Sequence, residues 1–235
     1  MARRPTPRFQ RERPSDLRHA TPWHRYSHYV KVLPERLEVL AREIPIPAGA
    51  TVLDYGCADL PYRGFFPEDA NYVAADLPGN ESASLELNAS GTVPLDDASV
   101  DVVVSTQVLE HVSNPDLYLS ECYRVLGPGG RMLLSTHGIF VYHPDPVDLS
   151  RWTCEGLRRV VEDAGFQIDR FEGIFGLAAT GIQLVQDALY YRLPPPLRPM
   201  LALPMQALIR LADRLTSDES KSLNASVFAL IARKP

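Results

Sequence analysis

The most informative segment of this sequence about its fold is TVLDYGCAD, residues 51–59. It begins as a short apolar run and reaches Asp54 and Gly56, the pattern of a buried strand that meets a loop. A glycine at this point lets the backbone turn tightly and approach a ligand where a Cβ would obstruct it. We predict that the first strand of a sheet ends here, at a ligand-binding loop.

Three further apolar runs follow this segment along the chain: YVAADL at 72–77, VDVVVST at 100–106 and RMLLSTHG at 131–138. The last two are nearly all apolar, as strands covered on both faces should be. The segment 107–130 between them has a helical pattern, and its closing GPGG predicts the helix end and the turn into the next strand. Strands that alternate with helices predict a parallel sheet wrapped on both sides.

The flanks extend this pattern. Residues 26–43 predict one helix, or two short ones separated at Pro34, and residues 153–164 predict another helix. Residues 166–176 and 225–234 predict the remaining strands.

Residues 177–215 predict an inserted helical pair, GIQLVQDALYY and MLALPMQALIRLADRL, on either side of the proline-rich linker PPPLRP. The pair has alternative interpretations as core or lid packing, as a dimer face, or as a membrane-surface contact. Because Arg210 and Arg214 alone give a thin basic face, we favour a lid or dimer element. Its apolar stripe consists of Leu201, Met205, Leu208, Ile209 and Leu215.

Length and composition indicate one globular domain. The chain has 235 residues, 45% of them hydrophobic, and its net charge of -5 disfavours a nucleic-acid partner. Residues 1–24 are rich in arginine and proline and predict a basic, mobile tail, so the domain covers 25–235. The three widely spaced cysteines favour a reducing cytoplasm, and no apolar run approaches the roughly 20 residues needed to span a bilayer.

Polar residues at the predicted strand ends indicate a nucleoside ligand, because parallel sheets bind ligands beyond the carboxyl ends of their strands. Asp54 lies at the first strand end, and Asp76 closes the second, where a carboxylate can accept hydrogen bonds from ribose hydroxyls. A dinucleotide fingerprint would place glycines at 58 and 61, but the chain has Ala58 and Pro61. A cofactor without phosphates is therefore favoured.

The chain resembles class I S-adenosylmethionine-dependent methyltransferases, and particularly a subgroup with Pro61, Tyr62 and Arg63 after the first loop. The resemblance runs from about Val52 to Phe166. It implies a Rossmann-like, doubly wound, mostly parallel seven-stranded α/β sheet, with the helical pair as an insertion near the C-terminus. The matching strings are VLDYGCADLPYRGFF, YVAADL, VPLDDASVDVVVSTQVLEHV, YRVLGPGGRMLLSTHG and HPDPVDLSRWT.

The resemblance also assigns cofactor contacts, residue by residue. It implies that the loop Gly56, Cys57 and Ala58, with Asp54, surrounds the methionine end of S-adenosylmethionine, although the family usually has glycine where Ala58 stands. The other implied contacts are Asp76 and Leu77 at the ribose, Asn88 and Ala89 at the adenine edge, and Thr106 and Gln107 beside the methionine moiety.

Three histidines lie near the expected mouth of the site and are candidate bases: His143, His111 and His137. We rank His143 first, because its string HPDPVDLSRWT resembles an acceptor-side motif of the subgroup. His111 has a structural alternative within the Leu-Glu-His-Val turn, and His137 has an alternative as a solvated loop residue. The same string places Asp148, Arg151 and Trp152 in the acceptor pocket. A metal held by His137, His143, Asp145 and Asp148 can be imagined, but nothing in the spacing requires one.

The expected activity is methyl transfer from S-adenosylmethionine to oxygen or nitrogen of a small molecule, such as a natural product or a sugar-containing metabolite. Ser105–Val108 lack the Asn-Pro-Pro-Tyr type of turn that accompanies methylation of nucleic-acid bases. A non-catalytic cofactor-binding scaffold and a nicotinamide oxidoreductase are the alternatives. The expected partners are a small-molecule acceptor and a second copy in a homodimer, without nucleic acid or stable membrane insertion.

Overall fold

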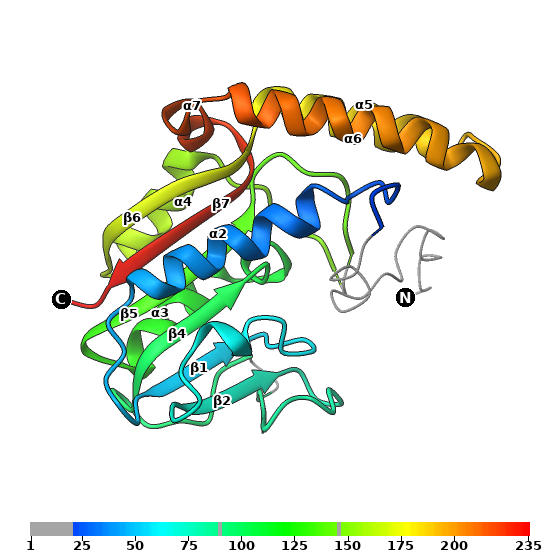
Figure 1. The fold of residues 1–235 in the computed structure, drawn as a ribbon. Coiled ribbons are helices and arrows are strands. Elements are labelled where there is room, and N and C mark those ends of the chain that lie inside the picture. Colours follow the sequence, from blue (N-terminus) through cyan, green and yellow to red (C-terminus); the bar gives the residue numbers. More distant parts are fainter. Residues whose placement is uncertain (1–20, 89–90, 145–146) are drawn as a thin grey trace.

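The computed structural model describes residues 21–88, 91–144 and 147–235, which form one seven-stranded sheet with helices on both faces (Figure 1). The strand order is β3-β2-β1-β4-β5-β7-β6. The strands are β1 (Thr51–Tyr55), β2 (Asn71–Asp76), β3 (Leu85–Glu86), β4 (Val100–Thr106), β5 (Leu126–His137), β6 (Gln167–Gly176) and β7 (Ala225–Arg233).

The sheet confirms the predicted Rossmann-like, doubly wound and mostly parallel architecture. Strands β1 to β5 pair in parallel, whereas β7 lies antiparallel between β5 and β6. The short strand β3 was not predicted, because two residues carry no periodic pattern. The predicted turn at 127–130 is instead an irregular segment inside β5, where the register with β4 shifts between Val100 and Val102.

The helices largely follow the predicted segments, with local start signals where the chain provides them. Asn114 and Thr153 each accept a hydrogen bond from a backbone N–H three residues later, which satisfies a donor of the first helical turn. The α-helices are α2 (Tyr29–Glu43), α3 (Pro115–Val125), α4 (Cys154–Asp163), α5 (Leu177–Tyr190), α6 (Arg198–Leu215) and α7 (Asp218–Leu223). Single 3-10 turns are η1 (Arg63–Phe65), η2 (Leu109–His111) and η3 (Pro195–Leu197).

Helix α2 is continuous through Pro34, so the alternative of two short helices is wrong. Helix α7 was not predicted. The predicted helical pair is present as α5 and α6, which run side by side across one end of the molecule (Figure 1). No helix in the described part of the chain is both long and apolar enough to span a membrane.

Alternation along the strands divides the core into two layers. In β7, Phe228 and Leu230 face the layer formed by α3 and α4, whereas Val227 and Ile231 face the opposite layer, which α2, α5 and α6 cover. Both faces of the sheet are therefore buried, and the carboxyl ends of its parallel strands are left to form the site.

Candidate cofactor and acceptor site

A cavity of about 1730 Å³ opens at the carboxyl ends of β1, β2, β4 and β5, the edge at which parallel sheets bind ligands. Most of the predicted cofactor contacts line it: Gly56, Ala58, Asp76, Leu77, Asn88, Thr106 and Gln107. Ala89 lies outside the described residues. The loop after β1 also contributes Pro61 and Tyr62, while the Arg63 guanidinium points away and donates to the carbonyls of Phe66 and Pro67.

The loop after β1 is held close to the turn after β4. Gly56 has a φ of +91°, and a Cβ built on it would lie 2.5 Å from Cγ2 of Val108. Glycine is therefore required here both by its backbone conformation and by the close approach of the Val108 side chain. Ala58 also has a positive φ, +46°, which costs an L-residue about 1–2 kcal/mol and explains the glycine expected there.

Asp76 joins the ends of β1 and β2. Its Oδ2 accepts hydrogen bonds from the backbone N–H of Ala58, at 3.0 Å, and from the Asn80 side chain, at 2.7 Å. Asn80 also donates to the carbonyl of Ala58, at 2.7 Å. The carboxylate predicted for the ribose therefore also orders the loop, together with Asn80, which the sequence analysis did not single out.

Asp54 and Cys57 lie beneath the loop, outside the cavity lining. Asp54 is 1% exposed and accepts a hydrogen bond from the Tyr72 hydroxyl at 2.7 Å. Burial raises its pKa to about 6; the Tyr72 bond opposes this change, and the charge of Asp76 adds to it. Burial likewise raises the pKa of the Cys57 thiol to about 12. Their predicted direct contact with the cofactor is not supported, because both side chains are turned into the protein.

Gln107 links β4, β5 and α2. It has a φ of +58°, and its Nε2 donates to Ser135 Oγ at 3.0 Å. Its Oε1 accepts a hydrogen bond from the hydroxyl of Tyr29 at 3.2 Å. Tyr29, on α2, also lines the cavity, a role that a helix pattern alone did not reveal.

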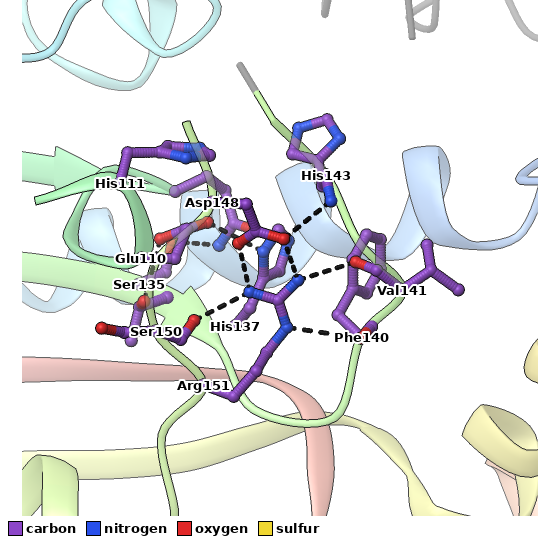
Figure 2. A network of polar contacts seen from close by, with 12 residues as sticks. Glu110, His111, Ser135, His137, Phe140, Val141, His143, Asp148, Ser150 and Arg151 are labelled. Carbon is purple, nitrogen blue, oxygen red and sulfur yellow. Dashed lines mark hydrogen bonds and ion pairs between the residues drawn. The ribbon is translucent and has the colours of Figure 1, made fainter. Parts of the chain in front are cut away.

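The three candidate histidines come together and all line the cavity (Figure 2). The ring centroid of His143 lies 5.8 Å from that of His137 and 5.9 Å from that of His111. Phe140 stacks on His137 with ring centroids 4.1 Å apart and planes at 5°. The Tyr29 hydroxyl lies 3.5 Å from Nε2 of His137. His137 is thus a packed residue, 2% exposed, and its alternative as a solvated loop residue is wrong.

Glu110 is the buried carboxylate of this cluster, and the sequence analysis missed its role. Its Oε1 lies 3.0 Å from Nδ1 of His137, and its Oε2 accepts a hydrogen bond from Thr136 at 2.8 Å. Burial acts to raise the pKa of Glu110, but His137 and other nearby donors outweigh burial, so this pKa lies below its usual value. A fully buried carboxylate is thereby kept ionised beside an imidazole.

The predicted acceptor residues Asp148, Arg151 and Trp152 lie outside the lining of the large cavity. Asp148 and Arg151 line a smaller adjoining cavity of about 300 Å³. The Arg151 guanidinium binds both oxygens of Asp148 and donates to the carbonyls of Phe140 and Val141 (Figure 2). Asp148 Oδ2 also accepts from the backbone N–H of His143 at 2.7 Å. The charges of Asp148 and Arg151 are satisfied by each other and by backbone groups of the same loop. The ion pair therefore holds in place the loop that carries Phe140 and His143 into the cavity.

The far wall of the cavity comes from the N-terminal segment and from α5. Arg25 Nη1 lies 3.2 Å from Asp187 Oδ1, and the Tyr26 hydroxyl donates to Asp187 Oδ2 at 3.1 Å. Gln206 on α6 donates to the carbonyl of Arg25. The helical pair thus contributes to the site. Its lining residues are Leu184, Asp187, Ala188, Tyr191 and Arg192.

A metal-binding group is not evident in the part of the chain that the structure describes. No three His, Cys, Asp or Glu side chains are placed there to hold an ion. Asp145, one of the imagined ligands, lies outside the described residues. The groups that the described site offers for chemistry are its histidines, carboxylates and aromatic side chains.

A Rossmann-like sheet with a glycine loop, a carboxylate after β2 and a large cavity at its carboxyl edge defines a nucleoside-cofactor protein. A methyltransferase domain model matches residues 65–134. An uncharacterized methyltransferase of Mycobacterium sp. (strain JLS) is 36% identical over 171 residues, 62% of this chain and 67% of the relative. The chain belongs to the S-adenosylmethionine-dependent methyltransferase family, whose cofactor is S-adenosylmethionine.

The chain is also similar to a second curated relative and to a solved methyltransferase structure. A probable S-adenosylmethionine-dependent methyltransferase of Mycolicibacterium smegmatis is 39% identical over 54% of this chain. The match covers 56% of that relative, so the chain spans little more than half of its length. Haemonchus contortus phosphoethanolamine N-methyltransferase 2, solved with S-adenosylhomocysteine and phosphomonomethylethanolamine, shares the fold, with a TM-score of 0.55 and 16% identity over 96% of this chain and 61% of that chain.

Proposed function

We propose that this chain transfers the methyl group of S-adenosylmethionine to an oxygen or nitrogen of a small molecule, such as a natural product or a sugar-containing metabolite. One observation carries the proposal: the Gly56 loop and the three histidines open into the same cavity. Ligand pockets commonly measure about 300–1,000 Å³. The volume of about 1730 Å³ leaves room for an acceptor beside the cofactor.

The residues present fit the cofactor, which supplies a methyl group on a positively charged sulfur. Gly56 lets the loop after β1 lie close against Val108, because it has no Cβ to meet that side chain. Asp76 accepts hydrogen bonds and would hold the ribose, while Leu77 and Asn88 would border the ribose and the adenine. Thr106 and Gln107 would border the methionine end. We also propose that the chain belongs to the methyltransferase subgroup with Pro61, Tyr62 and Arg63 after the first loop.

Within the site, His137 is the strongest candidate for the base, ahead of the sequence-based first choice His143. Its Nδ1 faces Glu110, whose pKa is held below its usual value, and its ring is fixed by Phe140. The ring would accept the proton of an acceptor hydroxyl as the bond from that oxygen to the methyl carbon forms and the bond from the methyl carbon to sulfur breaks, with S-adenosylhomocysteine as the leaving group. His143 and His111 lie at the mouth beside it and would contact the acceptor.

Aromatic side chains favour an acceptor with an apolar body. Tyr26, Tyr29, Phe140, Tyr142 and Tyr191 all line the cavity, and α5 covers its far side. This arrangement supports the lid interpretation of the helical pair within the 25–235 domain. A lid that excludes water would protect the reacting methyl group from side reactions.

The cellular setting is also proposed, as the cytoplasm. All three cysteines are free, and Cys57 and Cys122 are buried, which suits a reducing compartment. Neither a nucleic-acid partner nor a membrane-spanning segment is part of this proposal, and a homodimer remains the proposed assembly.

Isothermal titration with S-adenosylmethionine and S-adenosylhomocysteine, with NADH as control, tests the cofactor. We expect micromolar binding of the first two and none of NADH. Asp76→Ala should lose most of the affinity, because the ribose hydroxyls lose their acceptor. A folded wild-type chain that binds NADH alone would favour the oxidoreductase alternative.

A turnover assay then separates an enzyme from a scaffold. Release of S-adenosylhomocysteine is followed while hydroxyl- and amine-bearing acceptors are screened. Turnover with an acceptor supports the proposal. Tight cofactor binding with no turnover across both acceptor classes would favour the non-catalytic scaffold.

A further inference from the structure

The exposed surface of the α5–α6 hairpin, residues 177–215, has an unusual composition. Its exposed positions are apolar, glycine, proline or arginine, and this fully described segment exposes no carboxylate. The side chains of its two acidic residues are only 8% exposed for Asp187, which lies against Arg25, and 7% exposed for Asp213, which lies against His28 and Lys221. The large exposed apolar side chains are Leu177, Val185, Leu189, Leu197, Met200, Leu203, Leu208, Leu211 and Leu215.

On α6 these side chains form one stripe. Met200, Leu203, Leu208, Leu211 and Leu215 recur at helical spacing, and Met200 and Leu215 are 71% and 78% exposed. The opposite face packs against the protein through Ala202, Gln206, Ile209 and Asp213. Arg210 and Arg214 are exposed beside the stripe, and Arg192 is exposed just after α5. Helix α6 therefore presents an exposed apolar stripe with arginines beside it.

We propose that the α5–α6 hairpin docks this protein on the surface of an anionic lipid bilayer. The apolar stripe would enter the boundary between headgroups and acyl chains, and Arg192, Arg210 and Arg214 would meet the lipid phosphates. The proposal is peripheral docking, which is consistent with the absence of a spanning helix in the described residues.

Charge favours a lipid surface over a second copy of the hairpin. A two-fold dimer places the same patch of both copies against itself. Within the fully described segment 177–215, the arginines of one hairpin would find no exposed carboxylate on the other hairpin to pair with. Anionic headgroups supply that missing negative charge.

Docking would also place the cavity at the membrane. Ala188 and Arg192 are exposed on the hairpin and line the cavity as well. This part rests on the proposed function: an amphiphilic acceptor, with its polar end at the histidines and its apolar part towards the lipid, is the substrate class that fits such a position.

Vesicle co-sedimentation of the full chain tests the docking. Vesicles of phosphatidylcholine alone are compared with vesicles that also contain phosphatidylglycerol. We expect binding to the anionic vesicles, weakened by salt. Arg210→Ala and Arg214→Ala should each lower partitioning about fivefold. Leu208→Glu/Leu211→Glu should abolish binding, whereas Val39→Glu, an exposed apolar position on α2, should leave it unchanged.

Circular dichroism and titration with S-adenosylmethionine are performed on the same preparations. A folded wild-type chain that binds S-adenosylmethionine but no anionic vesicle overturns the docking and leaves the proposed function intact. Vesicle binding without cofactor binding supports the docking and overturns the proposed function. A wild-type dimer that Leu208→Glu/Leu211→Glu converts to monomer, with no vesicle binding, assigns the hairpin to a dimer face and also overturns the proposal.

Discussion

Oε1 of Glu110 lies 3.0 Å from Nδ1 of His137, and both side chains are almost fully withdrawn from solvent. Glu110 belongs to the 3-10 turn after β4, and His137 ends β5, so the topology of the sheet brings them together. A buried carboxylate beside an imidazole stabilises the charge that the ring acquires when it accepts a proton. The predictions about catalysis follow from this pair.

Replacement of His137 by Asn should lower turnover about 100-fold or more, because the acceptor loses its base. Cofactor affinity should change little. The matched variant is His143→Asn, for which we expect a smaller loss of turnover and a higher KM for the acceptor. Steady-state assays of S-adenosylhomocysteine release measure both. The reverse order of the two losses would return the role of base to His143.

Glu110→Gln should change how stability depends on acid. The pKa of Glu110 lies below its usual value in the folded protein, so its ionised form contributes stability above the unfolded pKa of about 4.3. This contribution disappears as the pH falls through the folded pKa. The variant should therefore be less stable than wild type at pH 7, with a difference that shrinks towards pH 3. Thermal melting across this range measures the difference, and a constant gap would contradict the assignment.

Asp54→Asn should gain stability relative to wild type as the pH rises, whereas Glu110→Gln should lose it. Burial raises the pKa of Asp54 from 3.8 to about 6, so the folded state holds this proton more tightly than the unfolded chain does. Wild-type stability therefore loses about 3 kcal/mol from this group as the pH rises from about 4 to above 6. The variant avoids this loss.

We expect the melting temperature of Asp54→Asn minus that of wild type to be about 6–12 °C higher at pH 7.5 than at pH 4. Titration with S-adenosylmethionine provides the control. Because Asp54 lies outside the cavity lining, affinity should be nearly unchanged, and a large loss would restore this residue to the cofactor contacts.

Gly56→Ala should weaken cofactor binding about tenfold or more, because the new Cβ would force Val108 or the loop to move. Gly49→Ala is a matched control: Gly49 also has a positive φ, +71°, but a Cβ added there would meet nothing within 4 Å. It should lower the melting temperature through backbone strain alone and leave cofactor affinity intact. Equal effects of the two variants on affinity would show that strain, and not the contact with Val108, controls the loop.

The sheet could be predicted from the sequence because its strands are apolar runs that end in polar or glycine residues. Val100–Thr106 and Ala225–Arg233 lie almost where the pattern placed them. The short β3 and the helix α7 carry too few residues to generate a period, and they were missed. Pro34 favours a break when the sequence is read alone, but it lies within the second turn of α2, and the helix continues through it.

The site was only partly predictable. Gly56 follows β1 directly and Asp76 is the last residue of β2, so their place in the cavity follows from the rule for parallel sheets. Glu110 and Tyr29 reach their partners through contacts between segments far apart in the sequence, for which a single sequence has no local signal. Asn80 binds Asp76 from only four residues further along the chain. Asp148 and Arg151 satisfy each other within one loop, and a polar motif alone does not reveal whether its charges face a ligand or each other.

Strand β7 lies between β5 and β6, which pair with it and not with each other. During synthesis on the ribosome, β6 emerges before the α5–α6 hairpin, and β7 emerges after it. The edge of β5 that pairs with β7 therefore stays unpaired until the whole hairpin has been synthesised. An open edge and a free apolar hairpin at that stage are sites at which a nascent chain can aggregate. Chaperone capture of the growing chain would matter most during this interval.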